Sequence, residues 1–144
     1  MHDTLRLYYV GYAIGSERYS LTSAATAQRL VTDSDYSDRG RRTHLEATMR
    51  MSRDFTPAQL EIARVTDSST VVETRVEVEG RRATVARGQT TQVVLPNLAF
   101  TIATHAPVTQ HLMLVRYWLA HGRPPRPLRR CRRGRCVWMA TWAL

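Results

Sequence analysis

The sequence predicts a mainly β fold: a curved antiparallel β-meander, half-barrel-like in shape, wrapped around one C-terminal helix. Short runs rich in Val, Thr and Tyr alternate with turn residues from Thr4 to about Leu95. The connections between these runs are shorter than the dozen or more residues that a parallel crossover needs, so neighbouring strands are expected to be antiparallel. After Pro107 the apolar residues recur with the period of a helix instead.

Eight strands are predicted, most of them joined by short turns. The turns are placed at segments that contain Gly or Asp, among them Ile14-Gly15-Ser16 and Asp38-Arg39-Gly40. The predicted strands are Leu5–Ala13, Glu17–Thr22, Gln28–Ser37, Arg42–Ser52, Ala58–Thr66, Thr70–Glu79, Arg82–Arg87 and Thr90–Leu95.

Two of these strands alternate between apolar and polar residues, which indicates a sheet with one face on the core and the other in solvent. The apolar faces hold Thr43, Leu45, Ala47, Met49 and Met51 in one strand and Val72, Thr74, Val76 and Val78 in the other. Cross-strand ion pairs are the simplest explanation of the polar face. Its residues include His44, Glu46, Glu73, Arg75, Glu77 and Glu79.

A helix is predicted between Pro107, which suits a first helical turn, and Gly122, which ends it together with Pro124. Its apolar arc is expected to pack against the concave side of the sheet. The arc holds Val108, Leu112, Leu114, Val115, Trp118 and Leu119, and the opposite side holds Thr109, Gln110, Met113 and Arg116. His121 is expected to cap the C-terminal end of the helix.

The net charge of +9 is divided unequally along the chain. Residues 1–120 hold 14 Arg and 12 Asp or Glu, a net charge of +2, whereas residues 121–144 hold seven Arg and no acid. Three prolines between Arg123 and Arg135 exclude a continuous helix or a central strand there. We therefore predict one domain over residues 1–125 and an Arg/Pro-rich tail over residues 126–144 that lies outside the core.

Several classes of function are disfavoured. The sequence has no nucleophile elbow, no zinc-protease helix motif and no glycine-rich phosphate loop. Cys131 and Cys136 supply only two of the four ligands that a zinc site needs, so no metal is expected, and no cofactor is expected either. Whether the two cysteines form a disulfide stays open. No run approaches the ~18 apolar residues of a membrane span, and the first residues do not begin a signal peptide. The chain as it stands is expected in the cytoplasm, with export left open for longer relatives.

The side chains best suited to chemistry are histidines with carboxylates nearby. His111 lies on the apolar arc of the predicted helix, where a buried, hydrogen-bonded role competes with a role as a base or ligand contact. The candidates for catalysis, as a small hydrolase of ester or glycoside bonds, are His111, His44, Glu46 and Glu73. A hydrophobic ligand between sheet and helix would contact Trp118, Tyr117, His111 and Leu114.

Four segments carry a family resemblance: residues 12–19 (YAIGSERY), 37–40 (SDRG), 54–57 (DFTP), and a helix signature from Ala106-Pro107-Val108 through Arg116-Tyr117-Trp118 to His121-Gly122-Arg123-Pro124. On these segments, about residues 4–125 resemble the N-terminal β-rich domain of bacterial multidomain amidohydrolase-type proteins. The resemblance implies a curved sheet around a helix and no catalytic residues in this domain, since the metal-dependent chemistry would lie in a downstream module. After about residue 128 the sequence departs from that pattern, which we interpret as a truncated or frame-shifted end.

These observations favour a non-catalytic β-domain that acts as a binding or assembly module and holds a hydrophobic small molecule between sheet and helix. The small hydrolase is one alternative, and anion or nucleic-acid binding through the Arg-rich tail is another. Nucleic acid is disfavoured because Trp138 and Trp142 follow the Arg run instead of interleaving with it. Unpaired strand edges are expected to allow a homodimer.

Overall fold

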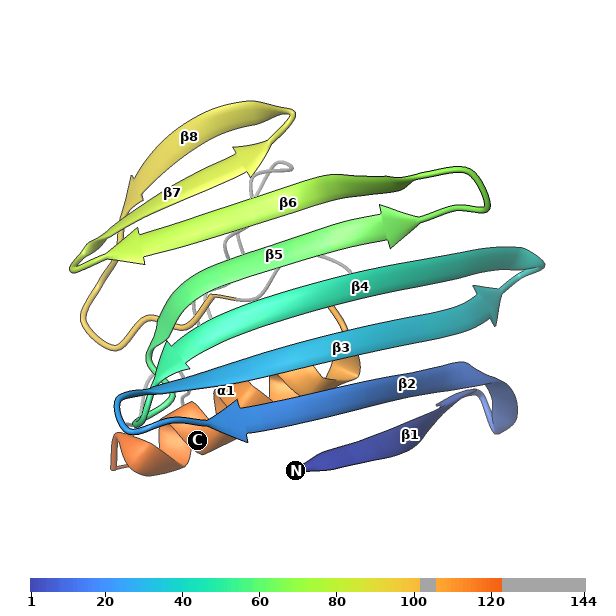
Figure 1. Ribbon diagram of the computed structural model, residues 1–144, viewed down its shortest axis with the longest axis horizontal. Helices are drawn as coiled ribbons and strands as arrows, with labels where there is room; N and C mark the ends of the chain where they lie inside the picture. The colour runs from blue at the N-terminus through green and yellow to red at the C-terminus, as the bar shows by residue number, and fades with distance from the viewer. Residues whose placement is uncertain (102–105, 123–144) are drawn as a thin grey trace.

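The computed structural model describes residues 1–101 and 106–122. Within these residues the chain forms eight strands and one helix (Figure 1). The elements are β1 (His2–Tyr9), β2 (Tyr12–Ser23), β3 (Ala27–Asp38), β4 (Arg41–Ser52), β5 (Pro57–Val65), β6 (Thr70–Glu79), β7 (Arg82–Arg87), β8 (Gln89–Val94) and α1 (Val108–Ala120). The predicted tail at residues 126–144 lies outside the described residues, and so do Cys131, Cys136, Trp138 and Trp142.

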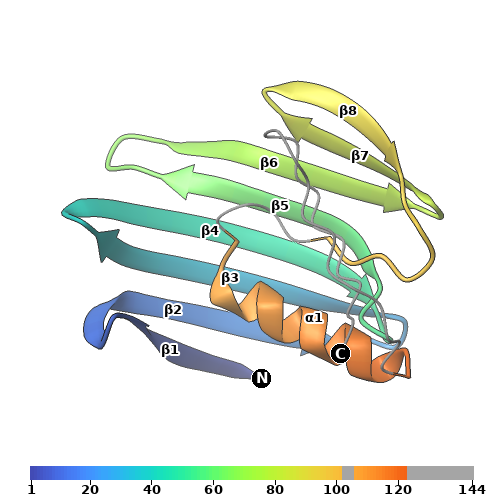
Figure 2. The same ribbon diagram turned by 180° about the vertical axis from the view of Figure 1, so that it is seen from behind.

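Each strand pairs antiparallel with its neighbours in the chain, and the order across the sheet is β1 to β8. The mainly β class, the antiparallel meander and the C-terminal helix are therefore confirmed. The half-barrel is not, because the sheet is neither closed nor strongly curled, and α1 lies across one face of it (Figures 1 and 2). Each hairpin adds its strand beside the last one, so among the described residues β1 and β8 are left as the two edges of the sheet.

The first hairpin differs from the prediction. The chain turns at Val10-Gly11, where both residues have positive φ (49° and 82°), and Gly15 lies inside β2 opposite Tyr36 of β3. A Cβ on Gly15 would lie 2.2 Å from the backbone oxygen of Asp35, so glycine is required there by the close approach of two strands and not by a turn. The turn predicted at residues 38–40 is confirmed.

One face of the sheet carries the core. The alternation predicted in β4 is confirmed, since its apolar face from Leu45 to Met51 is buried. In β6, Val76 is buried, whereas Val72 is 45% exposed because the pairing with β5 shifts between Ile62 and Ala63. The sheet residues of the core are Leu21, Leu30, Leu45, Ala47, Met49, Met51, Leu60, Ile62, Val76 and Ala83.

Helix α1 packs on this face with a different side from the one predicted. Of the predicted apolar arc, Leu114 is buried and Trp118 is half-buried, and the other four residues are exposed. The orientation follows from polar contacts that an apolar pattern does not show: the hydroxyl of Thr109 hydrogen-bonds to that of Thr32 on β3 at 2.9 Å. The buried residues of α1 are Thr109, Gln110, Met113, Leu114 and Tyr117.

The segment between β8 and α1 fills the core beside the helix. Phe100 is fully buried, and its ring centroid lies 5.3 Å from that of Tyr117. Leu95 is also buried, and its backbone N–H donates to the carbonyl oxygen of Arg81 at 2.7 Å. The helix and this segment therefore lie side by side on the core face of the sheet (Figure 2).

Candidate functional site

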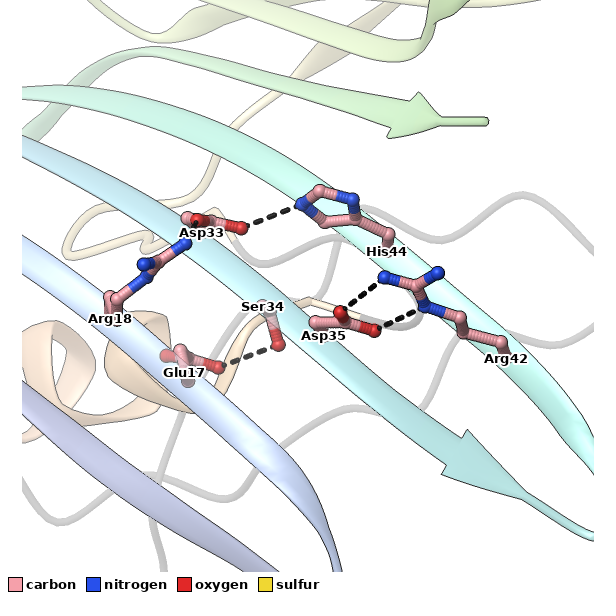
Figure 3. A network of polar contacts seen from close by, with 7 residues as sticks. All are labelled: Glu17, Arg18, Asp33, Ser34, Asp35, Arg42 and His44. Atoms are coloured by element: carbon pink, nitrogen blue, oxygen red, sulfur yellow. Dashed lines mark hydrogen bonds and ion pairs between the residues drawn. The ribbon is translucent and has the colours of Figure 1, made fainter. Parts of the chain in front are cut away.

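A buried carboxylate of the sheet holds the N-terminus of α1. Glu17 on β2 is fully buried, and its Oε2 and Oε1 accept the backbone N–H groups of Val108 (2.8 Å) and Thr109 (2.7 Å). The hydroxyl of Ser34 on β3 donates to Oε2 at 3.2 Å (Figure 3). The first N–H groups of a helix have no acceptor within the helix, and negative charge is favourable beside them. Glu17 therefore fixes how α1 is rotated against the sheet.

Sequence reasoning missed Glu17, although a signal was present. Along β2 every second residue faces the same way, so Glu17 shares its face with Tyr19 and the buried Leu21. A carboxylate at such an inward position must find donors, because an unpartnered buried carboxylate is costly. The donors come from a helix 91 residues further along the chain, which alternation within one strand does not indicate.

His121 holds the other end of α1. Its Nδ1 donates to the carbonyl oxygen of Tyr117 at 2.8 Å, which confirms the predicted cap. Its Nε2 lies 3.2 Å from Asp54 Oδ2 and 3.4 Å from Thr56 Oγ1, both in the connection between β4 and β5. The hydroxyl of Ser52 donates to Asp54 and holds the pKa of that carboxyl below its usual value.

This group does not have the geometry of a hydrolytic triad. A triad places the carboxylate on one ring nitrogen of the histidine and the nucleophilic hydroxyl on the other. Here Asp54 and Thr56 both face Nε2 of His121, while Nδ1 is engaged by a backbone carbonyl. The contacts fasten α1 to the β4–β5 connection.

With both ends fixed, α1 turns an apolar stripe away from the sheet. Val108, Leu112, Val115 and Leu119 follow one another at intervals of four, three and four residues, and each is between 43% and 46% exposed. The same intervals separate the contact positions of a coiled coil. His111 is exposed on this side as well, so the prediction that it is buried is wrong.

The other predicted ligand contacts lie partly in the core. Leu114 and Tyr117 are buried and Trp118 is half-buried. Tyr117 lines a cavity of about 250 Å³ together with Leu98 and Thr101. A second cavity, of about 210 Å³, lies beside Glu17 at the other end of the helix. Both volumes are below the roughly 300–1,000 Å³ typical of small-molecule sites.

The outer face of the sheet, opposite α1, carries an ion-pair network (Figure 3). Asp33 accepts hydrogen bonds from Arg18 at 2.5 Å and from Nε2 of His44 at 2.7 Å. Asp35 accepts two from Arg42, at 3.0 and 2.7 Å. Burial raises the pKa of Asp33, but the bonds from Arg18 and His44 outweigh it and the pKa lies below its usual value. The Arg42 guanidinium lowers the pKa of Asp35.

The predicted catalytic candidates are not brought together. Glu73 is bound to Arg64 of β5, and Glu46 is exposed on β4. His44 uses Asp33 as its carboxylate, and among the described residues no Ser, Thr or Cys side chain hydrogen-bonds to its ring. The cross-strand ion pairs predicted for the outer face are confirmed for His44 with Asp33 and for Arg75 with Glu61. Glu73 also pairs across strands, but on the core face, since Arg64 is the direct partner of the buried Leu45.

Ionisation of the Tyr117 hydroxyl is expected to lower the stability of the fold in alkali. Burial, and then the charge of Asp54, raise the pKa of Tyr117 to about 12, against about 10 in an unfolded chain. Because the folded pKa is the higher one, this stabilisation is fully present below about pH 10 and is lost as the pH rises through about 12. We expect Tyr117→Phe to remove that loss, measured as the unfolding free energy from neutral to alkaline pH. Tyr12→Phe, at a side chain 76% exposed, is the control; equal alkaline losses in wild type and Tyr117→Phe would contradict the assignment.

The described residues show neither a metal cluster nor a membrane-spanning helix. Within residues 1–101 and 106–122, no three His, Cys, Asp or Glu side chains gather as metal ligands, and no helix is long and apolar enough to cross a membrane. No family model, curated protein or solved structure matches this chain. The resemblance to the amidohydrolase-associated domain therefore stays a prediction.

Proposed function

We propose that this chain is a non-catalytic assembly module whose partner is a second copy of itself, docked through the outward stripe of α1. The observation that carries the proposal is the stripe: four aliphatic side chains at coiled-coil intervals. They are held in the outward position by the bonds that Glu17 accepts at one end of α1 and by the contacts of His121 Nε2 with the β4–β5 connection at the other. A helix rotated by these fixed polar contacts cannot turn its stripe inward. Two such helices can bury their stripes against each other in a symmetric contact.

The size of the stripe implies a weak dimer. Completing the burial of a half-exposed aliphatic side chain contributes roughly 1 kcal/mol, so eight such side chains contribute about 8 kcal/mol. Association costs about 4–15 kcal/mol in lost freedom of motion. The gain from burying the stripes and the cost of association are of similar size. We therefore expect a weak dimer whose population depends on the protein concentration.

The sheet edges offer the same partner a second contact. β8 has six residues, none of them charged, and is largely exposed, whereas β1 carries charged residues and a bulge between Leu7 and Tyr8. Charges and bulges protect an edge strand from pairing. Of the two edges, β8 is the one that suits pairing with a second copy.

The alternatives receive less support. A hydrophobic ligand between sheet and helix would have to fit the cavities of about 210 and 250 Å³. A hydrolase with a Ser, Thr or Cys nucleophile would need that side chain on the ring of His44 or His111. Among the described residues none hydrogen-bonds to His44, whose partner is Asp33, and His111 is exposed. Assembly with a second copy accounts for the exposed stripe of α1 and the exposed edge strand β8, which neither ligand binding nor hydrolysis explains.

The proposal predicts that Leu112→Glu disrupts the dimer. We expect the wild-type mass measured by light scattering to rise with concentration towards that of a dimer, and the Leu112→Glu mass to stay that of a monomer, because the charge would be desolvated in the contact. Val72→Glu is the matched control, since Val72 is 45% exposed on β6 and Leu112 is 43% exposed. Thr91→Lys places a charge on the edge strand β8, so its effect on the dimer shows how much this edge contributes in addition to the stripe. A wild type that stays monomeric at every concentration would refute the proposal.

A further inference from the structure

Two arginines face each other on the outer face of the sheet. Arg29 of β3 and Arg50 of β4 are direct cross-strand partners, and the same row continues to Thr22 on β2 and Gln59 on β5. Directly opposite residues of an antiparallel pair have Cβ atoms about 4.5–5.5 Å apart. The row lines a hollow of about 550 Å³, to which Thr48 also contributes.

The two arginines of this row differ from other arginines of the outer face in having no ion-pair partner among the described residues. Other arginines of the outer face have carboxylates, as Arg18 has Asp33 and Arg42 has Asp35. Neither Arg29 nor Arg50 makes an ion pair with a described residue. The row itself continues from Gln59 to Glu77 of β6, a carboxylate two strands away from Arg50 and three from Arg29. On the adjacent strand β5, Glu61 lies opposite Thr48 and is engaged by Arg75 at 2.6 Å.

Like charges directly opposite each other destabilise a pair of strands. Such an arrangement is explained when an anion lies between the two charges and converts the repulsion into two attractions. The two guanidinium groups are planar donors of paired hydrogen bonds, and the hydroxyls and the amide beside them can donate as well. The hollow therefore has enough hydrogen-bond donors to bind an anion with more oxygens than the two of a carboxylate.

We propose that this hollow, named here the Arg29–Arg50 site, binds a phosphoryl group, with the two arginines on either side of it and Thr22, Thr48 and Gln59 around it. A tetrahedral dianion supplies the number of oxygens and the charge that this donor set matches. The site lies on the opposite face of the sheet from α1 and is independent of the proposed dimer contact. It also differs from the anion site predicted for the Arg-rich tail, since all its residues belong to the sheet.

The test uses inorganic phosphate and the full chain. We expect phosphate to bind in calorimetric titration and to raise the melting temperature above that in chloride at equal ionic strength, since a ligand of the folded state stabilises it. Arg29→Gln and Arg50→Gln should each weaken phosphate binding by about tenfold or more, the loss of one charge-assisted contact. Arg82→Gln, at an exposed arginine of β7, is the matched control and should leave the affinity unchanged.

The stability of the same variants separates loss of binding from loss of fold. In phosphate-free buffer of low ionic strength, Arg29→Gln and Arg50→Gln should be at least as stable as the wild type, because each removes the repulsion between the two arginines. The inference is overturned if phosphate stabilises no more than chloride, or if Arg82→Gln weakens binding as much as the site variants do. Binding of a single-stranded oligonucleotide that inorganic phosphate does not displace would also overturn it.

Discussion

Replacing Glu17 by alanine is expected to lower the unfolding free energy by about 3 kcal/mol, because it leaves three donors without their acceptor. These are the buried N–H of Thr109, the partly buried N–H of Val108 and the hydroxyl of Ser34. For a chain of this length the melting temperature should fall by about 10 °C. Glu17→Gln retains the size of the side chain and one acceptor oxygen, so its loss should be smaller. Chemical denaturation monitored by circular dichroism measures both variants.

The matched control is Glu46→Ala, which removes an exposed carboxylate from the same sheet. Surface substitutions of this kind usually change stability by less than about 0.5 kcal/mol. If Glu17→Ala and Glu46→Ala proved equally mild, the carboxylate of Glu17 would not be the anchor of α1. The outward stripe would then lose its structural explanation as well.

Gly15→Ala is expected to cost about 3 kcal/mol or more, at the upper end of what overpacking costs. The added Cβ would lie 2.2 Å from the backbone oxygen of Asp35 and 2.5 Å from the Cα of Tyr36. Both obstacles belong to the backbone of β3, so no side chain can rotate out of the way. Relief requires β2 and β3 to separate, which would also disturb Glu17 two residues further along β2.

Gly11→Ala distinguishes this clash from the ordinary cost of replacing a glycine. Gly11 has a φ of 82°, and no described atom lies within 4 Å of a Cβ built there. Its replacement carries only the conformational cost of a left-handed residue, about 1–2 kcal/mol. Denaturation midpoints should therefore fall further for Gly15→Ala, and the reverse order would show that the strands can part at little cost.

The sequence alone was sufficient where one local rule decides the structure. The alternation of β4 was readable because Leu45, Ala47, Met49 and Met51 all face the core and their neighbours do not. The Arg39-Gly40 turn was readable because glycine favours the positive φ that a tight hairpin needs, and Gly40 has a φ of 77°. The boundaries of α1 were readable from Pro107 and Gly122 for similar local reasons.

The sequence was insufficient where two distant segments decide the structure together. Apolar residues occur around most of α1, so periodicity did not indicate which side meets the sheet; the contacts of Glu17 and Thr32 decide it. The first turn was predicted at Gly15 because glycine is typical of turns, but it lies at Val10-Gly11. Val10 gave no sign of a turn, because a β-branched residue disfavours the positive φ that it adopts there. The Arg29–Arg50 site was not predicted because it depends on the register of β3 against β4.

The nearest-neighbour order of the sheet has a consequence for how the protein folds. Every strand pairing joins segments adjacent in the chain, so each hairpin can form as soon as its two strands are available, at a low entropic cost of loop closure. The bond that the N–H of Val108 in α1 donates to Glu17 instead spans 91 residues. We therefore expect the helix to join last, and Glu17 to stay accessible to water until it does.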